Sequence, residues 1–338
     1  MKNKIKKILK RSSFKHRNNK ALYYIRNFAH QLLPLGTFRS QLENKLSSLA
    51  EFDANSIRNR VNYYNKLEMN VNLPDTSATL SDFRLKKKNK TYYFDTCEYT
   101  RYFLPGLKME YKFGDVTEVP VNPSIVKSRP IKGDNANSIL LNLDKLRHFT
   151  FVNDRKDYIK KKNMLVGRNN ATQHHRLKFL EMYIDHPMCN IGKINNDNSH
   201  MHLLREFLTI ENHLDYKFIL CLEGNDVASN LKWVMSSRSL AVMPRPKYET
   251  WFMEGTLIPD YHYVLIKDDY SDLQERMEYY ISHNTEALKI IENAHQYIDQ
   301  FRNRKREDLI SLLVLEKYFY RTNQKEPGRQ LKLLLSPD

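Results

Sequence analysis

Hydrophobic residues between positions 216 and 267 come in short uninterrupted runs, separated by polar breaks and by one stretch of helical spacing. Three apolar runs have the length of buried strands: 216–222, 239–243 and 262–266. Four apolar residues between the first two runs recur at the spacing of a helix: Val227, Leu231, Val234 and Met235. Short apolar strands that alternate with helices are typical of a parallel sheet covered on both faces, so the segment predicts an α/β fold.

Polar residues follow the predicted strands at the point where each one ends. Glu223, Gly224 and Asn225 come after the first run, and residues 245–249 come after the second. Parallel sheets bind their ligands in the crevice beyond the carboxyl ends of their strands. The pattern therefore predicts a ligand site at this edge of the sheet.

The flanking segments predict more helices and strands. Residues 20–70 predict helices, the first with an apolar face that ends before Pro34 and Gly36: Leu22, Ile25, Phe28, Ala29, Leu32 and Leu33. Apolar and aromatic runs predict strands at 91–94, 109–113, 148–152 and 163–166. A turn over 167–175 and a helix over 176–183 follow, and the polar residues 185–213 show no clear element. A capping box from Ser271 to Gln274 predicts a helix through 281, and two more helices are predicted at 288–301 and 308–320, the second being the last.

Composition narrows the class of protein. With 338 residues, 41% hydrophobic and 12% aromatic, the chain is long and apolar enough for two folded domains. It contains no apolar stretch near the roughly 20 residues of a membrane-spanning helix, and no signal-peptide pattern. Its three cysteines are sparse and odd in number, which favours buried free thiols in a reducing cytoplasm.

The net charge of +16 is concentrated at the start of the chain. The first twenty residues hold nine cations and no acidic residue: Lys2, Lys4, Lys6, Lys7, Lys10, Arg11, Lys15, Arg17 and Lys20. Apolar residues lie among them, a composition that suits an anionic membrane surface. A solvated arm and a nucleic-acid contact are the alternatives, although no nucleic-acid-binding motif supports the second.

Several motifs, in their order and spacing, resemble glycosyltransferase family 90. They are residues 127–131 (Lys-Ser-Arg-Pro-Ile), 166–168 (Val-Gly-Arg) with Arg176, 216–220, 223–232, Ser239-Leu240 and 248–251 (Tyr-Glu-Thr-Trp). The family includes protein O-glucosyltransferases, capsule-associated xylosyltransferases and bacterial lipopolysaccharide glycosyltransferases. The resemblance covers roughly residues 110–300 and is closest to the bacterial lipopolysaccharide branch.

The resemblance implies a GT-B-like α/β fold, with two facing Rossmann-like domains and a C-terminal helix that crosses back. It divides the chain into a basic membrane-associating arm with the first helix (1–40), an acceptor-side domain with the catalytic base (41–155), a nucleotide-sugar-binding domain (156–305) and a C-terminal helix and tail (306–338). No metal or other cofactor is expected. A GT-A enzyme usually carries an Asp-x-Asp metal motif, and this chain has none.

The implied activity is inverting transfer of a hexose, glucose or galactose, from a UDP-sugar to a hydroxyl of the lipopolysaccharide inner core. The enzyme would work in the cytoplasm, peripherally on the anionic inner face of the inner membrane, without a nucleic-acid partner. Two alternatives stay open. One is a glycosyltransferase that acts on capsule polysaccharide or protein O-glycan, and the other is a non-enzymatic, basic nucleic-acid-binding protein.

The resemblance also assigns a catalytic base. Asp115, in Asp-Val-Thr-Glu-Val-Pro, matches the family's Asp-x-x-x-Val-Pro. An acceptor hydroxyl must lose its proton as it attacks the anomeric carbon, and a carboxylate within hydrogen-bond reach can take that proton. The competing interpretation is an aspartate that caps a turn ahead of a proline.

Nucleotide-binding residues are expected along the same motifs. Arg176 is expected at the diphosphate because a guanidinium can bind phosphate bidentately, and Gly167 and Arg168 are expected in the turn before it. The start of the central helix is predicted to supply amide contacts, with Asp226 as its cap and these residues at the nucleotide: Gly224, Asn225, Val227, Ala228, Asn230 and Lys232. Glu249 could bind ribose hydroxyls, and Lys127 and Arg129 could face an anionic ligand; the alternative for these three is solvated loop charge.

Overall fold

The computed structural model describes residues 16, 18–85 and 89–335, and the chain divides into two compact units. Unit 1 consists of Met1–Asn19, Arg147–Pro246 and Thr256–Gln300. Unit 2 consists of Lys20–Leu146, Lys247–Gly255 and Phe301–Asp338. The polypeptide chain therefore leaves unit 1 at residue 247, contributes the nine residues 247–255 to unit 2, and then returns to unit 1.

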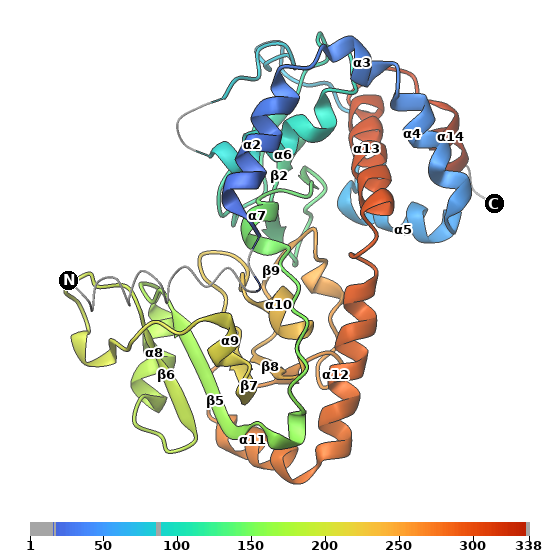
Figure 1. The fold of residues 1–338 in the computed structure, drawn as a ribbon. Helices are drawn as coiled ribbons and strands as arrows, with labels where there is room; N and C mark the ends of the chain where they lie inside the picture. The colour runs from blue at the N-terminus through green and yellow to red at the C-terminus, as the bar shows by residue number, and fades with distance from the viewer. Residues whose placement is uncertain (1–15, 17, 86–88, 336–338) are drawn as a thin grey trace. The chain divides into compact units, whose positions relative to one another are not determined.

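Unit 1 is built on a five-stranded sheet with the order β10-β8-β7-β5-β6, in which every neighbouring pair is parallel (Figure 1). The strands are β5 (Lys162–Asn169), β6 (Cys189–Lys193), β7 (Tyr216–Leu220), β8 (Leu240–Met243) and β10 (Val264–Leu265). The predicted parallel α/β sheet is confirmed, and four of its five strands lie where the apolar runs placed them. The fifth, β6, lies in the polar region that showed no clear element, because this strand contains Asn190, Gly192 and Lys193 among its residues.

Both faces of this sheet are buried. Alternate strand residues, among them Leu165, Phe218 and Val242, share one core cluster with residues of α8 (His174–Tyr183), α11 (Leu273–Ser282) and α12 (Asn284–Asp299). The intervening residues are buried as well: Val166, Ile219 and Ala241. The short α10 (Leu231–Met235) contacts β8 and α12, while η2 (Tyr158–Lys160), η3 (Met201–Leu203) and α9 (Ile210–His213) lie in the connections. Covered faces leave the ends of the strands as the places where polar groups can gather.

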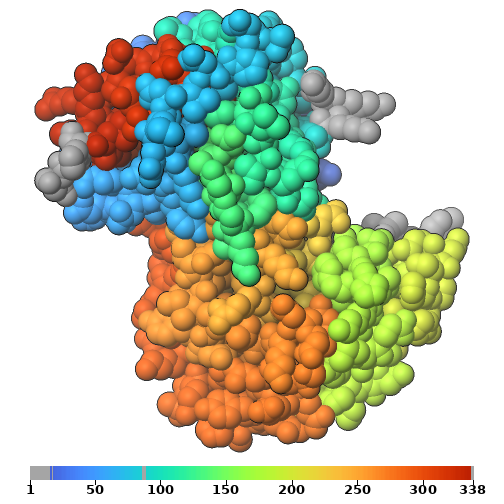
Figure 2. All heavy atoms as spheres, turned by 180° about the vertical axis from the view of Figure 1, so that it is seen from behind, coloured from blue at the N-terminus to red at the C-terminus, as the bar shows by residue number. Residues whose placement is uncertain are grey.

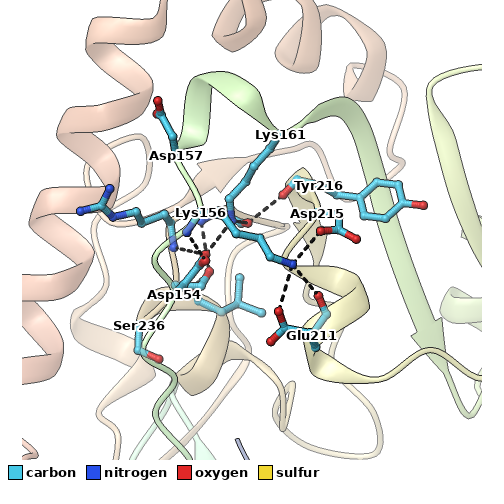
Figure 3. Close-up of polar contacts among 12 residues, drawn as sticks. Asp154, Lys156, Asp157, Lys161, Glu211, Asp215, Tyr216 and Ser236 are labelled. Carbon is cyan, nitrogen blue, oxygen red and sulfur yellow. Dashed lines mark hydrogen bonds and ion pairs between the residues drawn. The ribbon is translucent and has the colours of Figure 1, made fainter. Parts of the chain in front are cut away.

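A buried ion pair fixes the amino ends of these strands (Figure 3). Lys161 Nζ lies 2.6 Å from Asp154 Oδ2, and both side chains are 1% exposed. The same lysine donates to Ser239 Oγ (2.7 Å), which donates to the carbonyl of Tyr216 (2.7 Å). Nearby, Lys156 Nζ pairs with an Asp215 carboxylate oxygen at 2.6 Å. The bonds of Lys161 and Ser239 tie together the starts of β5, β7 and β8, and leave the carboxyl ends as the open edge.

Unit 2 combines helices with two small sheets. Its helices are α2 (Lys20–Gln31), α3 (Leu35–Arg39), α4 (Leu42–Ser47), η1 (Ser48–Glu51), α5 (Ala54–Tyr64), α6 (Lys90–Thr100), α13 (Arg304–Arg321) and α14 (Arg329–Leu335). A parallel sheet has the order β1-β2-β4: β1 (Glu110–Lys112), β2 (Ser124–Val126) and β4 (Ser138–Leu140). An antiparallel pair joins β3 (Ser128–Pro130) to β9 (Tyr248–Thr250). Two short elements lie where the units meet in sequence: α7 (Lys145–His148) and η4 (Glu254–Thr256).

Helix α13 is the centre of unit 2, since it contacts α4, α5, α6 and α14. Its Glu307 accepts hydrogen bonds from Arg60 Nη2 (2.8 Å) and Trp251 Nε1 (2.6 Å), and the Trp251 ring stacks on Tyr64 with centroids 3.8 Å apart. Figure 2 shows α14, in red, beside the blue atoms of α5, which it contacts. The segment 247–255 is thus held inside unit 2 by a tryptophan that packs between two helices.

Several predicted elements of the sequence are wrong. Residues 91–94 lie in α6 rather than in a strand, because aromatic and polar residues at helical spacing bury one face: Tyr92, Asp95, Thr96 and Tyr99. Residues 148–152 form no strand; α7 ends at His148 and irregular chain follows. The capping box at Ser271 is absent, since α11 begins after Asp272 without a side-chain cap and Ser271 Oγ donates to Asp269 instead. The predicted helix 308–320 is confirmed as part of α13, but α14 follows it.

Candidate functional site

The predicted base Asp115 lies in unit 2, in the connection between β1 and β2. The chain turns there at Gly114, whose φ of +116° is a conformation that favours glycine. Lys127 Nζ lies 2.7 Å from Asp115 Oδ1, and the lysine side chain is 1% exposed while the aspartate side chain is 30% exposed. The ammonium stabilises the ionised carboxylate, which is the form that can accept a proton. Asp115 is therefore a partly exposed carboxylate that is held in place by a buried cation.

The two residues after Lys127 anchor the same region. Ser128 Oγ lies 3.1 Å from both the amide nitrogen and the carbonyl oxygen of Val116, so it holds the backbone next to Asp115. Arg129 is fully buried and donates from Nε to Glu249 (2.7 Å) and from Nη2 to the Tyr63 carbonyl (2.7 Å). Neither Lys127 nor Arg129 is loop charge. Both cations engage carboxylates of the protein, and their predicted contact with an anionic ligand stays a prediction.

Glu249 is placed differently from the sequence expectation. It lies within β9, opposite Arg129 in the antiparallel register, and is 2% exposed. Its carboxylate accepts hydrogen bonds from Arg129 Nε and from the Tyr63 hydroxyl. The interpretation of Glu249 as a solvated loop residue is wrong, because a strand pairing and a buried guanidinium fix its side chain. A contact with ribose stays a prediction, in competition with these bonds.

Arg176 lies in unit 1, on the first half of α8, and reaches the chain that follows β7. Its guanidinium donates to three carbonyl oxygens: Leu222 (2.7 Å), Glu223 (2.7 Å) and Asn170 (2.8 Å). A guanidinium has five N–H groups, so two remain that donate to no residue the structure describes. Burial lowers the pKa of Arg176, and no carboxylate is bonded to it among the described residues. The side chain is a positioned cation at the carboxyl ends of β5 and β7.

Gly224 and Asn225 join this cluster. A Cβ atom on Gly224 would lie 3.2 Å from Arg176 Nη2, so the absence of a side chain lets the guanidinium lie against the loop. Gln173 Nε2 donates to Asn225 Oδ1 (2.8 Å), and His175 Nε2 donates to the carbonyl of Glu223 (2.8 Å). The structure thus brings three predicted residues together at the predicted edge of the sheet. Gln173 and His175 were missed, although Gln173 is the N-cap residue of α8 and His175 directly precedes Arg176.

Other predicted nucleotide contacts occupy different positions. Gly167 and Arg168 belong to β5, so their placement in a turn is wrong. Arg168 donates to the carbonyls of Glu206 (2.8 Å) and Asn190 (2.7 Å), which ties the edge of the sheet. The central helix starts at Leu231 and spans five residues, so residues 224–230 do not open it and Asp226 is not its cap. Three predicted residues near it are buried: Val227 (4% exposed), Ala228 (3%) and Lys232 (0%). Asn230 is half-buried, and its Nδ2 donates to the carbonyl of Leu220 at 2.9 Å.

Chemical features outside these clusters are limited. All three cysteines are free thiols, as predicted, and burial raises the pKa of Cys97 to about 11 and that of Cys189 to about 12. No three His, Cys, Asp or Glu side chains in the described ranges are grouped as metal ligands. Within those same ranges, no helix combines the length and the apolarity that crossing a membrane requires.

Comparison with known proteins decides the family. The family model described as Glycosyl transferase family 90 matches residues 144–318. The chain belongs to glycosyltransferase family 90. It is also 41% identical over 305 residues to a protein named O-glucosyltransferase LpsA from Dichelobacter nodosus, an alignment that covers 89% of this chain and 95% of that protein. The family 90 chain is thus a glycosyltransferase, and the non-enzymatic alternative is set aside.

Proposed function

We propose that the protein is an inverting O-glucosyltransferase that moves glucose from a UDP-sugar to a hydroxyl of the lipopolysaccharide inner core. Similarity across most of the chain to a protein named O-glucosyltransferase LpsA supports glucose over galactose. The observation that carries the chemistry is the partly exposed Asp115 carboxylate held by the buried ammonium of Lys127. A glycosyltransferase acting on capsule or protein glycans has no comparable support.

In this proposal the reaction is a single in-line displacement. Asp115 accepts the proton of the acceptor hydroxyl as the oxygen attacks the anomeric carbon, a contribution typically worth ~10²–10⁴-fold. The glycosidic bond forms on the opposite face from the departing UDP, which inverts the anomeric configuration. Lys127 holds the carboxylate in position before the acceptor arrives. A GT-B arrangement, with both units facing one donor, belongs to the proposal.

The diphosphate leaves with negative charge that needs stabilisation. Arg176 is the proposed partner, because its guanidinium is held by three backbone carbonyls and two N–H groups remain for phosphate oxygens. Preorganised donors of this kind need no rearrangement when the charge develops. The protein would therefore work with a guanidinium where other glycosyltransferases use a divalent cation.

The basic residues 2–20 support an acceptor on an anionic surface. Lipopolysaccharide precursors are phosphorylated lipid glycans, and a Lys or Arg near an anionic membrane contributes about 1 kcal/mol of attraction. The described part of this segment is residues 16 and 18–20, and the remainder lies outside the described residues. We place the enzyme at the cytoplasmic face of the inner membrane.

A panel of nucleotide sugars tests the donor. A ligand at ~100 times its Kd raises the free energy of unfolding by about 2.7 kcal/mol, enough to rank donors by thermal shift. UDP-glucose should give the largest shift, in buffer with a chelator as well as with Mg²⁺. Transfer to truncated lipopolysaccharide, with the product's anomeric configuration read by NMR, tests the rest. Retention of configuration, or transfer to peptide but not to the core acceptor, would overturn the proposal.

A further inference from the structure

Helix α2 and the start of α3 carry an apolar stripe that faces solvent. Leu22, Ile25 and Leu32 are 62%, 67% and 86% exposed. Leu33 and Leu35 continue the stripe at 49% and 50%. Their spacing places Leu22 and Ile25 on one face of α2, and Leu32 follows in the turn after the helix. Contiguous apolar surface of this kind marks a binding surface in most soluble proteins.

Helix α2 is attached to α6 in the body of unit 2. The Tyr23 hydroxyl donates to Asp95 Oδ1 of α6 (2.7 Å), and the Phe28 ring packs edge-on against Phe94 with centroids 5.0 Å apart. Asn27 is 7% exposed. These contacts with α6 fix the orientation of the helix, so its exposed apolar stripe has a defined position on the surface.

A cavity of about 300 Å³ lies at the end of this stripe. Leu35 lines it together with Phe83, Tyr93, Arg84 and Arg101. Arg101 is 8% exposed, and its Nε donates to the carbonyl of Cys97 at 2.6 Å. Its Nη2 is buried and donates to no atom that the structure describes. The guanidinium groups of Arg84 and Arg101 give this cavity positive charge, which would attract an anion.

The charged residues of the stripe's own segment are all basic. Residues 20–42 contain no acidic residue, and Lys20, Arg26 and Arg39 lie on α2 and α3 themselves. Two carboxylates of α6 lie against the helix: Asp95 accepts from the Tyr23 hydroxyl (2.7 Å), and Glu98 lies 2.7 Å from Lys145 Nζ and 3.9 Å from Arg26 Nη2. An apolar stripe with cations along it and a cationic cavity at its end matches the acyl region and the phosphate headgroups of an anionic bilayer.

We propose that the α2–α3 stripe docks on an anionic phospholipid bilayer and that the Arg101 cavity takes one phosphate headgroup. The proposal refines the membrane location given above, but it depends on neither the donor nor the acceptor. Lipid binding is measured without any sugar, so a failure here leaves the proposed reaction intact, and a failed transfer assay leaves this proposal intact.

Sedimentation of the full-length protein with vesicles tests it. Binding should be strong to phosphatidylcholine mixed with phosphatidylglycerol and weak to phosphatidylcholine alone. Ile25→Ser combined with Leu32→Ser should lower the partition coefficient at least ~10-fold, because two exposed apolar side chains no longer enter the bilayer. The matched control is Met69→Ser combined with Leu333→Ser, which removes two side chains that are 80% and 57% exposed elsewhere on unit 2. The control should bind like the native protein.

Two further variants test the cavity. Arg101→Gln should reduce the preference for phosphatidylglycerol, and the exposed Arg84→Gln, which lines the same cavity with little risk to folding, should do so in part. An equal loss of vesicle binding in the Ile25/Leu32 double variant and in the Met69/Leu333 control would overturn the proposal. So would stabilisation by inorganic phosphate without vesicle binding, or a dimer in solution that the Ile25 and Leu32 substitutions dissociate.

Discussion

Lys127 and Asp115 form an ion pair in which one partner is enclosed and the other is reachable: Nζ and Oδ1 are 2.7 Å apart, with side-chain exposures of 1% and 30%. The ammonium is buried, while part of the carboxylate is accessible to solvent. This asymmetry suits a base that must meet an acceptor hydroxyl from solution.

Replacing Asp115 by asparagine should remove the proton acceptor and keep its shape. Turnover should fall at least ~10²-fold, while the Kd for UDP, measured by calorimetry, stays near the native value. Asp75→Asn, at a side chain fully open to solvent, is the control and should leave turnover unchanged. Turnover within a few-fold of native in the Asp115 variant would mean that another group is the base.

Arg176→Lys should weaken UDP binding at least ~10-fold, because an ammonium keeps the charge but loses the planar fork. The measurement is the Kd for UDP by calorimetry. Gly224→Ala should act in the same direction, since the new Cβ would lie 3.2 Å from Arg176 Nη2 and the guanidinium must move. Lys178→Gln, exposed on the same helix, is the control. Native affinity in both the Arg176 and Gly224 variants would exclude the assigned diphosphate contact.

Glu249→Ala should mainly affect stability. It leaves the Arg129 guanidinium buried without its carboxylate, a change that typically costs about 3–5 kcal/mol of unfolding free energy. Chemical denaturation measures the loss, and Glu118→Ala, at an exposed pair with Lys112, should cost far less. Arg129→Met combined with Glu249→Leu should recover part of the stability. A large rise in KM for the donor with native stability would instead favour a ribose contact for Glu249.

The pH dependence of stability should carry a contribution from His213. This histidine is 7% exposed, its Nδ1 donates to the Thr209 carbonyl (2.8 Å), and burial lowers its pKa from 6.5 to about 4. The unfolded chain therefore binds more protons between those two values, so the free energy of unfolding falls as pH drops through that window. Between pH 7.5 and 5 the contribution is about 2 kcal/mol.

His213→Gln should flatten this part of the profile. The test compares unfolding free energies of native protein and variant across the window. His202→Gln removes a histidine whose side chain is 59% exposed and should leave the slope as it is. Parallel profiles for native protein and His213 variant would show that the imidazole does not titrate differently on folding.

Features that depend on residues close together in the sequence could be predicted from the sequence. Strands β5, β7, β8 and β10 follow from apolar runs. The placement of Gly224 and Asn225 follows from the rule for parallel sheets, and that of Arg176 from the family resemblance. The sequence could not predict β3 and β9, because Arg129 and Glu249 pair across 120 positions and each looks like loop charge on its own. Aromatic residues misled the prediction at 91–94, where Tyr92 and Phe94 favour a strand by propensity but pack in a helix.

The excursion of residues 247–255 has a consequence for how the protein is made. Trp251 contacts both Tyr64 and Glu307. Unit 2 therefore folds only when three segments that are far apart in the sequence come together: 20–146, 247–255 and 301–338. A ribosome delivers Tyr64 long before Trp251 and Glu307, and contacts so distant in sequence form slowly. Neither half of the gene can therefore encode a self-sufficient unit 2, and early termination would leave an incomplete core exposed to proteases.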